Sequence, residues 1–416
     1  MDDVIVAGAG LAGLRAARDL NDRGLAVAVV EARDRVGGRG FTTSLGGRPA
    51  ELGGSWFTPE HDQVRAELGR YGLAVRDFPP VRHARWLTGG ELRQGLPVPW
   101  AELPALERAL ARVLRDAEAA AAGDLAIAGI SARDYVESLH VGAAARDFLL
   151  GWWVVMGGAP PERGAVIDAL ASIHDHGGLA GVIGCLAHAP AAGWSALADA
   201  LASTPGLTLH TGWELAAVEH NDAGVTCVAR DGRVLTARAL VLALPLNCLP
   251  AIAATPPLPG PVADAAGANA GAAVKLLMLA GGIEPHGIAV GAGPGLNWLY
   301  ADELRDGSVL VTGFGWQDER HPLDDDGSVA RALAAFYPAA ELAGWARHDW
   351  IGDPASRGTW LTAPAGRVEL LHPARFRPAG RIAFAGSDVA AEQAGWFEGA
   401  LRSGAAAADD ILARLG

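Results

Sequence analysis

Two glycine-rich segments at opposite ends of the chain constrain its fold more than any other feature. Near the N-terminus, Gly8, Gly10 and Gly13 follow a short apolar strand at residues 4–7 and open a helix over residues 11–20. Near the C-terminus, residues 381–404 predict a buried strand, a tight glycine turn, an acidic residue and a helix. Each pattern brings backbone N–H groups and a helix N-terminus to a phosphate or a flat ring. We therefore expect the chain to close around one large ligand that both ends contact.

The N-terminal segment has the βαβ pattern of a dinucleotide-binding fold. After the helix, residues 25–30 form an uninterrupted apolar strand that ends at Glu31. The glycines permit a tight turn and the close approach of a pyrophosphate, and the acid can bind both ribose hydroxyls. The glycine motif alone fits NAD or FAD, but the second ligand-binding segment, at residues 381–404, favours FAD. The pattern predicts an α/β fold with a Rossmann-like FAD-binding domain.

The length of the chain and its proline-rich crossings predict two discontinuous domains. A chain of 416 residues is longer than one ordinary core requires. The strand and helix patterns leave the first domain near residues 78–104, return at residues 239–243, and leave again through residues 249–261. We assign residues 1–76, 188–262 and 364–416 to the FAD-binding domain, and residues 77–187 and 263–363 to an α+β substrate-binding domain.

Charge and cysteine content exclude several classes of protein. The net charge is −13 and no basic patch is evident, which argues against a nucleic-acid partner. The three cysteines are far apart in the sequence, so neither a disulfide framework nor a cysteine metal site is expected. The first residues lack a signal-peptide pattern, and no apolar run is long enough to cross a membrane. We expect a cytoplasmic protein with no membrane partner.

Two further glycine pairs extend the expected binding surface. The pair at residues 37–38 precedes Arg39, which can neutralise phosphate, and the pair at residues 53–54 lies beside Trp56. Glycine lets a ligand approach the backbone closely, so the second pair fits a flat ring lying against the chain.

Together these motifs resemble the flavin-dependent amine oxidases, the monoamine oxidase-like group of FAD enzymes. The resemblance extends nearly end to end, through residues 8–13, 31–39, 51–56 and 384–400 and through Lys275 in an apolar strand at residues 272–279. It implies a two-domain fold in which the flavin ring is the floor of a cavity in the second domain. Thr359 stands where mitochondrial members carry the cysteine that bonds the flavin, and no cysteine is near it in the sequence. Non-covalent FAD is therefore expected.

The resemblance also implies which residues contact the cofactor. Glu31 would bind the adenosine ribose, the Val218 backbone would meet the adenine, and Trp396 and Phe397 would lie at the pyrimidine end of the ring. The full expected set is Gly8, Gly10, Ala12, Gly13, Glu31, Ala32, Arg33, Gly38, Arg39, Gly53, Gly54, Ser55, Trp56, Val218, Gly386, Ser387, Asp388, Trp396 and Phe397.

Three residues carry the expected catalytic chemistry. Lys275 is the only lysine in the chain, and the matching lysine of the family holds a water against the flavin. A lysine whose stem is buried while its amine reaches solvent is the alternative. Trp360 and Trp396 match the two aromatic positions that flank the substrate above the flavin. Two ordinary core tryptophans are the alternative there.

The segment His174-Asp175-His176 could be a metal or a substrate site. On a strand the two histidines would share a face, but no third ligand is evident nearby, so no metal is expected. The resemblance makes His176 a candidate substrate contact, together with Trp360 and Trp396. Thr58 stands where plant-type polyamine oxidases have an acid, which argues against a polyamine substrate.

The resemblance implies oxidation of the C–N bond of a small amine to an imine, which water hydrolyses to an aldehyde or ketone. Molecular oxygen would take the electrons and give H2O2, and a homodimer is compatible with this family. An FAD-dependent C–C desaturase or protoporphyrinogen-type oxidase is an alternative, because such enzymes share the FAD-binding fold. Lys275 and the paired tryptophans argue against it. A non-catalytic flavoprotein is a further alternative. The sequence leaves open which amine, including an amino acid, is the substrate, and whether the enzyme is an oxidase or a dehydrogenase.

Overall fold

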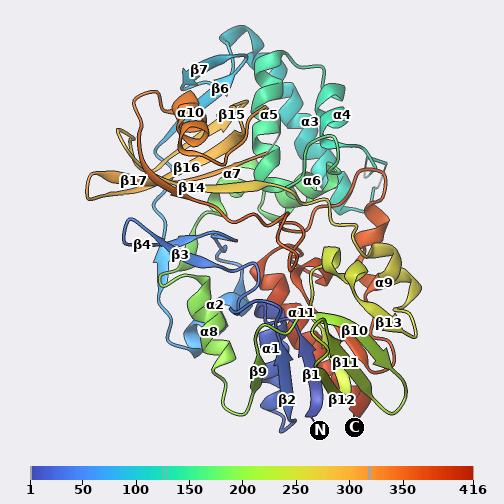
Figure 1. The fold of residues 1–416 in the computed structure, drawn as a ribbon. Coiled ribbons are helices and arrows are strands. Elements are labelled where there is room, and N and C mark those ends of the chain that lie inside the picture. Colours follow the sequence, from blue (N-terminus) through green and yellow to red (C-terminus); the bar gives the residue numbers. More distant parts are fainter. Residues whose placement is uncertain (1, 125, 128, 317–319, 416) are drawn as a thin grey trace.

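Two β-sheets, each with its own helices, organise the chain in a computed structural model (Figure 1). The structure describes residues 2–124, 126–127, 129–316 and 320–415. Over these residues the first sheet has eight strands and the second has seven. Both chain termini lie at the outer end of the first sheet (Figure 1).

The first sheet has a parallel centre and an antiparallel edge. Strand β1 pairs parallel with β2 and β12, β2 pairs parallel with β9, and β12 pairs parallel with β19. On the other side, β11 pairs in antiparallel fashion with both β12 and β10, and β13 pairs parallel with β10. Its order is β13 (Ala253–Thr255), β10 (Leu215–His220), β11 (Val225–Ala229), β12 (Val234–Leu242), β1 (Asp2–Ala7), β2 (Val27–Val30) and β9 (Thr208–His210), with β19 (Ile382–Phe384) paired to β12.

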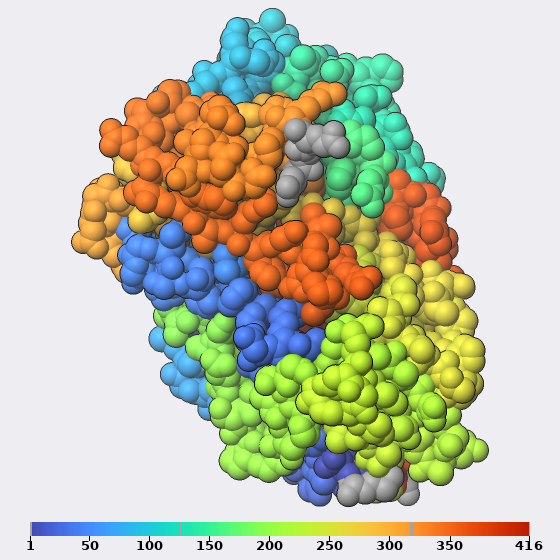
Figure 2. Space-filling model, viewed as in Figure 1, coloured from blue at the N-terminus to red at the C-terminus, as the bar shows by residue number. Residues whose placement is uncertain are grey.

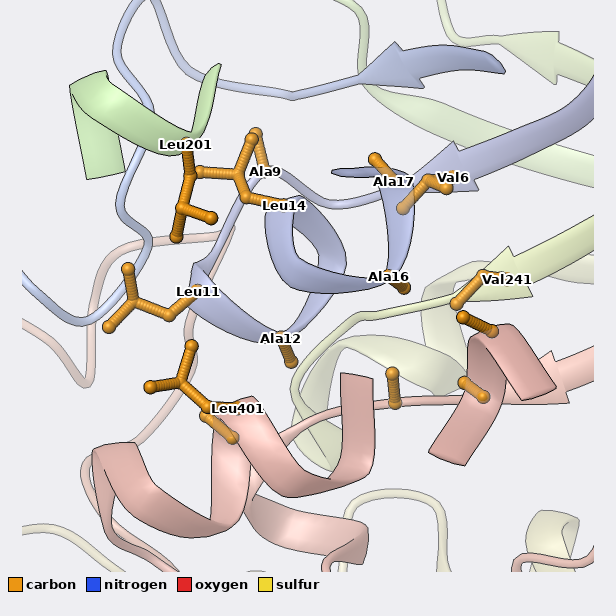
Figure 3. Close-up of a cluster of buried hydrophobic side chains, with 14 of the residues drawn as sticks. Val6, Ala9, Leu11, Ala12, Leu14, Ala16, Ala17, Leu201, Val241 and Leu401 are labelled. Carbon is orange, nitrogen blue, oxygen red and sulfur yellow. The ribbon is translucent and has the colours of Figure 1, made fainter. Parts of the chain in front are cut away.

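Helix α1 (Leu11–Asn21) packs on this sheet together with α11 (Phe397–Leu415), as Figure 3 shows. Val6, Leu14 and Leu401 belong to one buried cluster between them. The two helices approach closely because α11 has Gly404 at the contact, where a Cβ atom would lie 2.3 Å from the Ala12 carbonyl oxygen. The first and last helices of the chain are thereby fixed side by side.

The second sheet is mixed and is covered by helices from the middle of the chain. Helix α5 packs against β6, β15 and β16. The sheet order is β18 (Glu341–Ala346), β14 (Val274–Gly281), β17 (Ser308–Gly315), β16 (Leu296–Arg305), β15 (Gly287–Gly291), β6 (His83–Thr88) and β7 (Glu91–Gln94). Its helices are α3 (Leu103–Ala121), α4 (Ala132–Ser138), α5 (Ala143–Met156), α6 (Ile167–Asp175), α7 (Leu179–Gly184) and α10 (Asp326–Phe336).

Short elements complete the two bodies. The hairpin β3 (Thr42–Leu45) with β4 (Arg48–Glu51) packs on the second sheet, whereas the helices α2 (Asp62–Arg70), α8 (Trp194–Ala202) and α9 (Gly260–Ala265) pack in the two cores beside the first sheet. Strand β5 (Val75–Asp77) pairs with β8 (His188–Pro190). In Figure 2 the blue N-terminal segments meet the orange-red late segments across the middle of the molecule. An ion pair of 2.7 Å between Arg33 Nη2 and Asp353 Oδ2 joins them. Among the described helices, none is both long and apolar enough to cross a bilayer.

Replacing Leu14 by alanine tests the packing between α1 and the sheet. Leu14 is fully buried, and removal of such a leucine costs about 2–5 kcal/mol of unfolding free energy, because its transfer energy is lost and a cavity remains. Urea unfolding at saturating FAD should report a loss in this range. The matched control is Leu304→Ala, since Leu304 is 57% exposed, and it should change the unfolding free energy little. Equal losses in the two variants would contradict this account of the core.

Candidate active site

One cavity of about 690 Å³ runs between the two sheets and collects most of the residues expected from the sequence. Both ends of the chain contribute to its wall, as do β14 and helices α5 and α6. The expected residues on the wall are Gly8, Gly10, Ala12, Glu31, Ala32, Arg33, Gly38, Arg39, Gly53, Gly54, Ser55, Trp56, His176, Lys275, Trp360, Gly386, Ser387, Trp396 and Phe397.

The glycines after β1 form a cradle that larger residues would fill. Gly8 has a φ of +105°, and a Cβ atom there would lie 2.4 Å from the Ala243 carbonyl oxygen. Gly13 is not part of the cavity wall. A Cβ on Gly13 would lie 2.0 Å from the Gly8 carbonyl oxygen, so it allows the helix to start close to the strand. No side chain caps α1 at Gly10, which leaves its first N–H groups available to a phosphate.

Glu31 is held by the same loop. It is 5% exposed, and its two carboxylate oxygens accept hydrogen bonds from the backbone N–H groups of Ala9 at 2.9 Å and Arg33 at 3.0 Å. The carboxylate is therefore fixed at the end of β2, where a ribose would lie in a dinucleotide fold. The cradle, the uncapped helix and the fixed acid fit the adenine half of FAD.

Two arginines tie this loop to the late segments of the chain. Arg33 pairs with Asp353, and Arg39 donates to Asp388 Oδ1 at 2.6 Å and to the Thr359 carbonyl oxygen at 2.7 Å. Asp388 lies behind the cavity wall, where its other oxygen accepts from the Leu246 N–H at 3.2 Å. Its observed contacts fix the position of Arg39, rather than placing the carboxylate on the cavity wall as expected.

The structure does not place Val218 at the cavity. Its side chain is 1% exposed in the core between β10 and its neighbours, and Leu215 of the same strand lines the cavity instead. The expected contact is through the Val218 backbone, and it stays a prediction.

The glycine pair at residues 53–54 forms a flat part of the wall. A Cβ on Gly53 would lie 1.8 Å from the Arg39 carbonyl oxygen, and one on Gly54 would lie 2.5 Å from the ring of Phe397. Phe397 in turn lies on Trp194, with ring centroids 3.9 Å apart. Backbone and stacked rings therefore leave space for a flat ring against residues 53–54, and the residues present fit the flavin half of FAD.

Lys275 reaches this part of the wall from β14. Its amine donates hydrogen bonds to the Gly53 carbonyl oxygen and to Ser55 Oγ, both at 2.5 Å. The residue is 5% exposed, so it does not extend to solvent. Burial lowers the pKa of Lys275 from 10.5 to about 7, and the buried carboxylate of Glu51 opposes this shift only in part. A neutral amine is therefore accessible near neutral pH.

Trp360 and Trp396 both line the cavity and are held by different neighbours. Trp360 lies against Gly158, where a Cβ atom would come within 2.4 Å of the indole, and its ring meets Phe314 edge-on at 5.9 Å. Trp396 lies between two histidines, with centroid distances of 5.1 Å to His61 and 5.9 Å to His176. Both rings are fixed parts of the wall.

The histidine segment is helical, contrary to the strand expected from the sequence. Residues 174 and 175 end α6, and His176 follows as its C-terminal cap. Two side chains two positions apart on a helix do not share a face, which removes the geometric basis of a histidine pair. Within the described parts of the chain, no three His, Cys, Asp or Glu side chains are grouped as for a metal ion.

Sequence reasoning missed one face of α6 and several aromatic residues. Asp168, Ala171, Ser172 and Asp175 line the cavity at spacings of three and four residues, the signal of one helical face. That signal was present in the sequence, but the segment was interpreted as a strand. The other additional wall residues include Trp152, Val155 and Met156 of α5, Trp298 of β16, Phe314 of β17, and Trp350 and Asp353.

Two of the three cysteines also reach the cavity, although none is close to Thr359 in the sequence. Cys185 and Cys248 are part of its wall. Burial raises their pKa values to about 12 and about 11, so both remain protonated thiols at neutral pH. A protonated thiol is a poor nucleophile, which agrees with a flavin that has no covalent link to the protein.

Comparison with known proteins agrees with this geometry. A sequence profile for flavin containing amine oxidoreductases matches residues 11–412. The chain is 31% identical to (S)-6-hydroxynicotine oxidase of Paenarthrobacter nicotinovorans, over 99% of this chain and 100% of that protein. It is 26% identical to pseudooxynicotine dehydrogenase of a Pseudomonas species, over 97% of this chain and 84% of that protein.

Solved structures have the same fold. A wild-type putrescine oxidase bound to putrescine superposes with a TM-score of 0.85 at 24% identity, with 99% of each chain covered. Cyclohexylamine oxidase from Brevibacterium oxydans IH-35A gives 0.85 at 21% identity, with 100% of this chain and 99% of that chain covered. The predicted monoamine oxidase-like α/β fold is thereby confirmed. The chain belongs to the flavin containing amine oxidoreductase family, and it is an enzyme that oxidises amines with FAD bound non-covalently.

Proposed function

We propose that the protein oxidises the C–N bond of a small amine in the cavity beside Lys275, with molecular oxygen as the electron acceptor. The observation that carries the proposal is a buried lysine held against the glycine pair at residues 53–54, in a cavity that Trp360 and Trp396 also line. A full-length relative at 31% identity is named as an oxidase, which supports oxygen as the acceptor. The imine product would be hydrolysed by water to a carbonyl compound.

Lys275 would hold a water at the reacting end of the cavity. When the amine is neutral, its two N–H groups are used by the Gly53 carbonyl oxygen and Ser55 Oγ, and its lone pair can accept a hydrogen bond from water. FAD, when bound, supplies the acceptor for the hydride equivalent that leaves the substrate. The lysine would therefore act through an ordered water, without forming a bond to the substrate.

Trp360 and Trp396 would orient the substrate amine and exclude bulk water. Their rings are fixed by Gly158 and Phe314 on one side and by His61 and His176 on the other. Flat apolar faces favour a neutral amine over an ammonium that has lost its water shell. A neutral amine has a free lone pair on its nitrogen. The reaction requires this lone pair when the hydride equivalent leaves the neighbouring carbon.

We also assign the two domains at the boundaries expected from the sequence. All strands of the eight-stranded sheet lie within residues 1–76, 188–262 and 364–416, which supports one FAD-binding domain. All strands of the seven-stranded sheet lie within residues 77–187 and 263–363, which supports one substrate-binding domain. The cavity lies where the two meet.

Substitution of Trp360, Trp396 and Lys275 tests the roles proposed for their side chains. Trp360→Ala and Trp396→Ala should each slow anaerobic flavin reduction by an amine at least about tenfold, because positioning of the reacting groups is lost. Lys275→Met should slow turnover while the enzyme still binds FAD. Stopped-flow absorbance at the flavin bands measures the reductive step, and oxygen mixing measures reoxidation separately.

Trp100→Ala is the matched control, because Trp100 is 77% exposed and lies outside the cavity wall. It should leave both half-reactions unchanged. Full amine turnover in both Trp360→Ala and Trp396→Ala would refute the aromatic-pair assignment. Flavin that no amine reduces, in the unmodified protein, would refute the proposed reaction itself.

The buried lysine also predicts a pH-dependent stability. Because the folded-state pKa of Lys275 is lowered from 10.5 to about 7, the unfolded chain binds more protons between these values. This residue therefore makes stability rise with pH across that window. The unfolding free energy of Lys275→Met minus that of the parent should be largest near pH 7 and should shrink toward pH 10. A difference that stays constant with pH would show that the pKa of Lys275 is not lowered in the folded state.

A further inference from the structure

One face of helix α6 adds acidic and polar side chains to the cavity wall. Asp168, Ser172, Asp175 and His176 all line the cavity from this helix. Asp168 is the deepest of them in the fold, and its Oδ2 accepts a hydrogen bond from the Ala363 N–H at 2.7 Å. Burial raises the pKa of the Asp168 carboxyl from 3.8 to about 7, so the site would favour a cationic neighbour that keeps the carboxylate ionised.

His176 adds a hydrogen-bond acceptor at the other end of the same face. Its Nδ1 lies 2.7 Å from the Ser172 carbonyl oxygen, which can only accept, so Nδ1 carries the proton. In a neutral imidazole Nε2 is then an acceptor. Among the described residues, Nε2 makes no hydrogen bond. In this neutral form, the ring beside Trp396 offers a lone pair.

Two of the three arginines of the cavity wall are paired with carboxylates. Arg33 pairs with Asp353, and Arg39 pairs with Asp388 and the Thr359 carbonyl oxygen, both on the FAD-binding side. Arg357 is exposed and donates to the Pro354 carbonyl oxygen in the same late segment. Lys275 donates to Gly53 and Ser55.

None of the hydrogen bonds or ion pairs that these four cations of the described wall make involves α6. A substrate carboxylate beside Asp168 would lie next to a like charge without a paired cation, and an unpaired buried charge is costly. Asp175, at the end of α6, is more exposed. A group that donates hydrogen bonds, above all an ammonium, would instead meet the Asp168 and Asp175 carboxylates and the His176 lone pair.

We propose that the α6 face formed by Asp168, Asp175 and His176 selects amines that carry a second hydrogen-bond-donating cationic group, and rejects amino acids. The inference rests on the proposed function, since it names the substrate class of the same cavity. One amine would lie between Trp360 and Trp396, and the second would lie along α6. The two carboxylates are seven residues apart, which is about 10 Å along a helix. Diamines of different chain length could therefore reach Asp168 or Asp175 with their second amine.

The test compares three matched series of straight-chain compounds three to six carbons long: α,ω-diamines, monoamines and ω-amino acids. Anaerobic flavin reduction gives a specificity ratio of diamine to monoamine at each length. A charge-assisted hydrogen bond corresponds to about tenfold or more in affinity, so the best diamine should exceed its monoamine by at least about that factor. The amino acid should react more slowly than either.

Asp168→Asn and Asp175→Asn keep the side-chain shape and remove the charge. At least one should lower the diamine-to-monoamine ratio by about tenfold, with a larger loss for the diamine than for the monoamine. Asp409→Asn is the control, because Asp409 lies on α11 and its side chain is 75% exposed, and it should leave the ratio unchanged. A ratio near one at every length, or a ratio that neither substitution alters, would overturn the inference.

A binding measurement separates this inference from the proposed function. The ligands are diamines and monoamines in which every amine-bearing carbon carries two methyl groups. These compounds lack the hydrogen that oxidation removes, but they can still bind and perturb the flavin spectrum. Tighter binding of such a diamine, weakened in Asp168→Asn or Asp175→Asn, supports selection by α6 even where no amine reduces the flavin. Equal dissociation constants for the diamine and the monoamine would overturn selection by α6 even if amine oxidation is observed.

Discussion

The close packing of the first helix against the last is the constraint on which the rest of the structure depends. Neither end of the chain forms a cofactor site alone, because the cradle after β1 and the turn before α11 each supply only part of one wall. Gly404 brings α11 against the backbone of Ala12, and the Arg39–Asp388 ion pair fixes the segment between them. Strands β6, β7 and β14–β18, which lie between these two ends in the sequence, then build the second sheet and the substrate end of the cavity.

Glycine, rather than any polar side chain, shapes the flavin end of the cavity. At Gly53 and Gly54 an added Cβ would collide with backbone or with Phe397, and at Gly158 it would collide with Trp360. Each contact fixes a ring or a strand to within a fraction of an ångström, because packed interiors tolerate little overlap. The same contacts that make the wall flat therefore also fix the Trp360 ring in the cavity wall.

The sequence predicted the parts of the site that have a local signature. The glycine cradle, Glu31 and the single lysine in an apolar strand were identified because each needs only its neighbours in the chain to be recognised. Leu215 was not identified as part of the cavity wall, because alternation along a strand does not reveal a shift in pairing register such as that between Leu215 and Ala217. Trp298 and Phe314 have the pattern of ordinary core residues, and only the approach of the two sheets turns them into cavity wall.

The α6 face illustrates a different limit. Asp168 and Asp175 have helical spacing, but two histidines at alternate positions suggested a strand, and a short polar segment offers little to decide between them. The apolar spacing decides the matter in the folded chain, since Ala169, Leu170 and Ile173 are buried beneath the helix and orient its polar residues toward the cavity. The function of such a face can be inferred only after the helix has been placed.

Electrostatics of the whole chain and of the cavity act in the same direction. A net charge of −13 attracts cationic amines from solution, and the carboxylates of α6 continue that attraction inside the cavity. A fully charged lysine at the flavin end would repel the same substrate. Burial of Lys275 removes this conflict, because a pKa near 7 lets the residue give up its proton as a cation approaches. In the proposed reaction the buried lysine and the acidic helix would therefore be complementary. The lysine would carry less positive charge where the neutral amine reacts, and the helix would supply negative charge where a second cation binds.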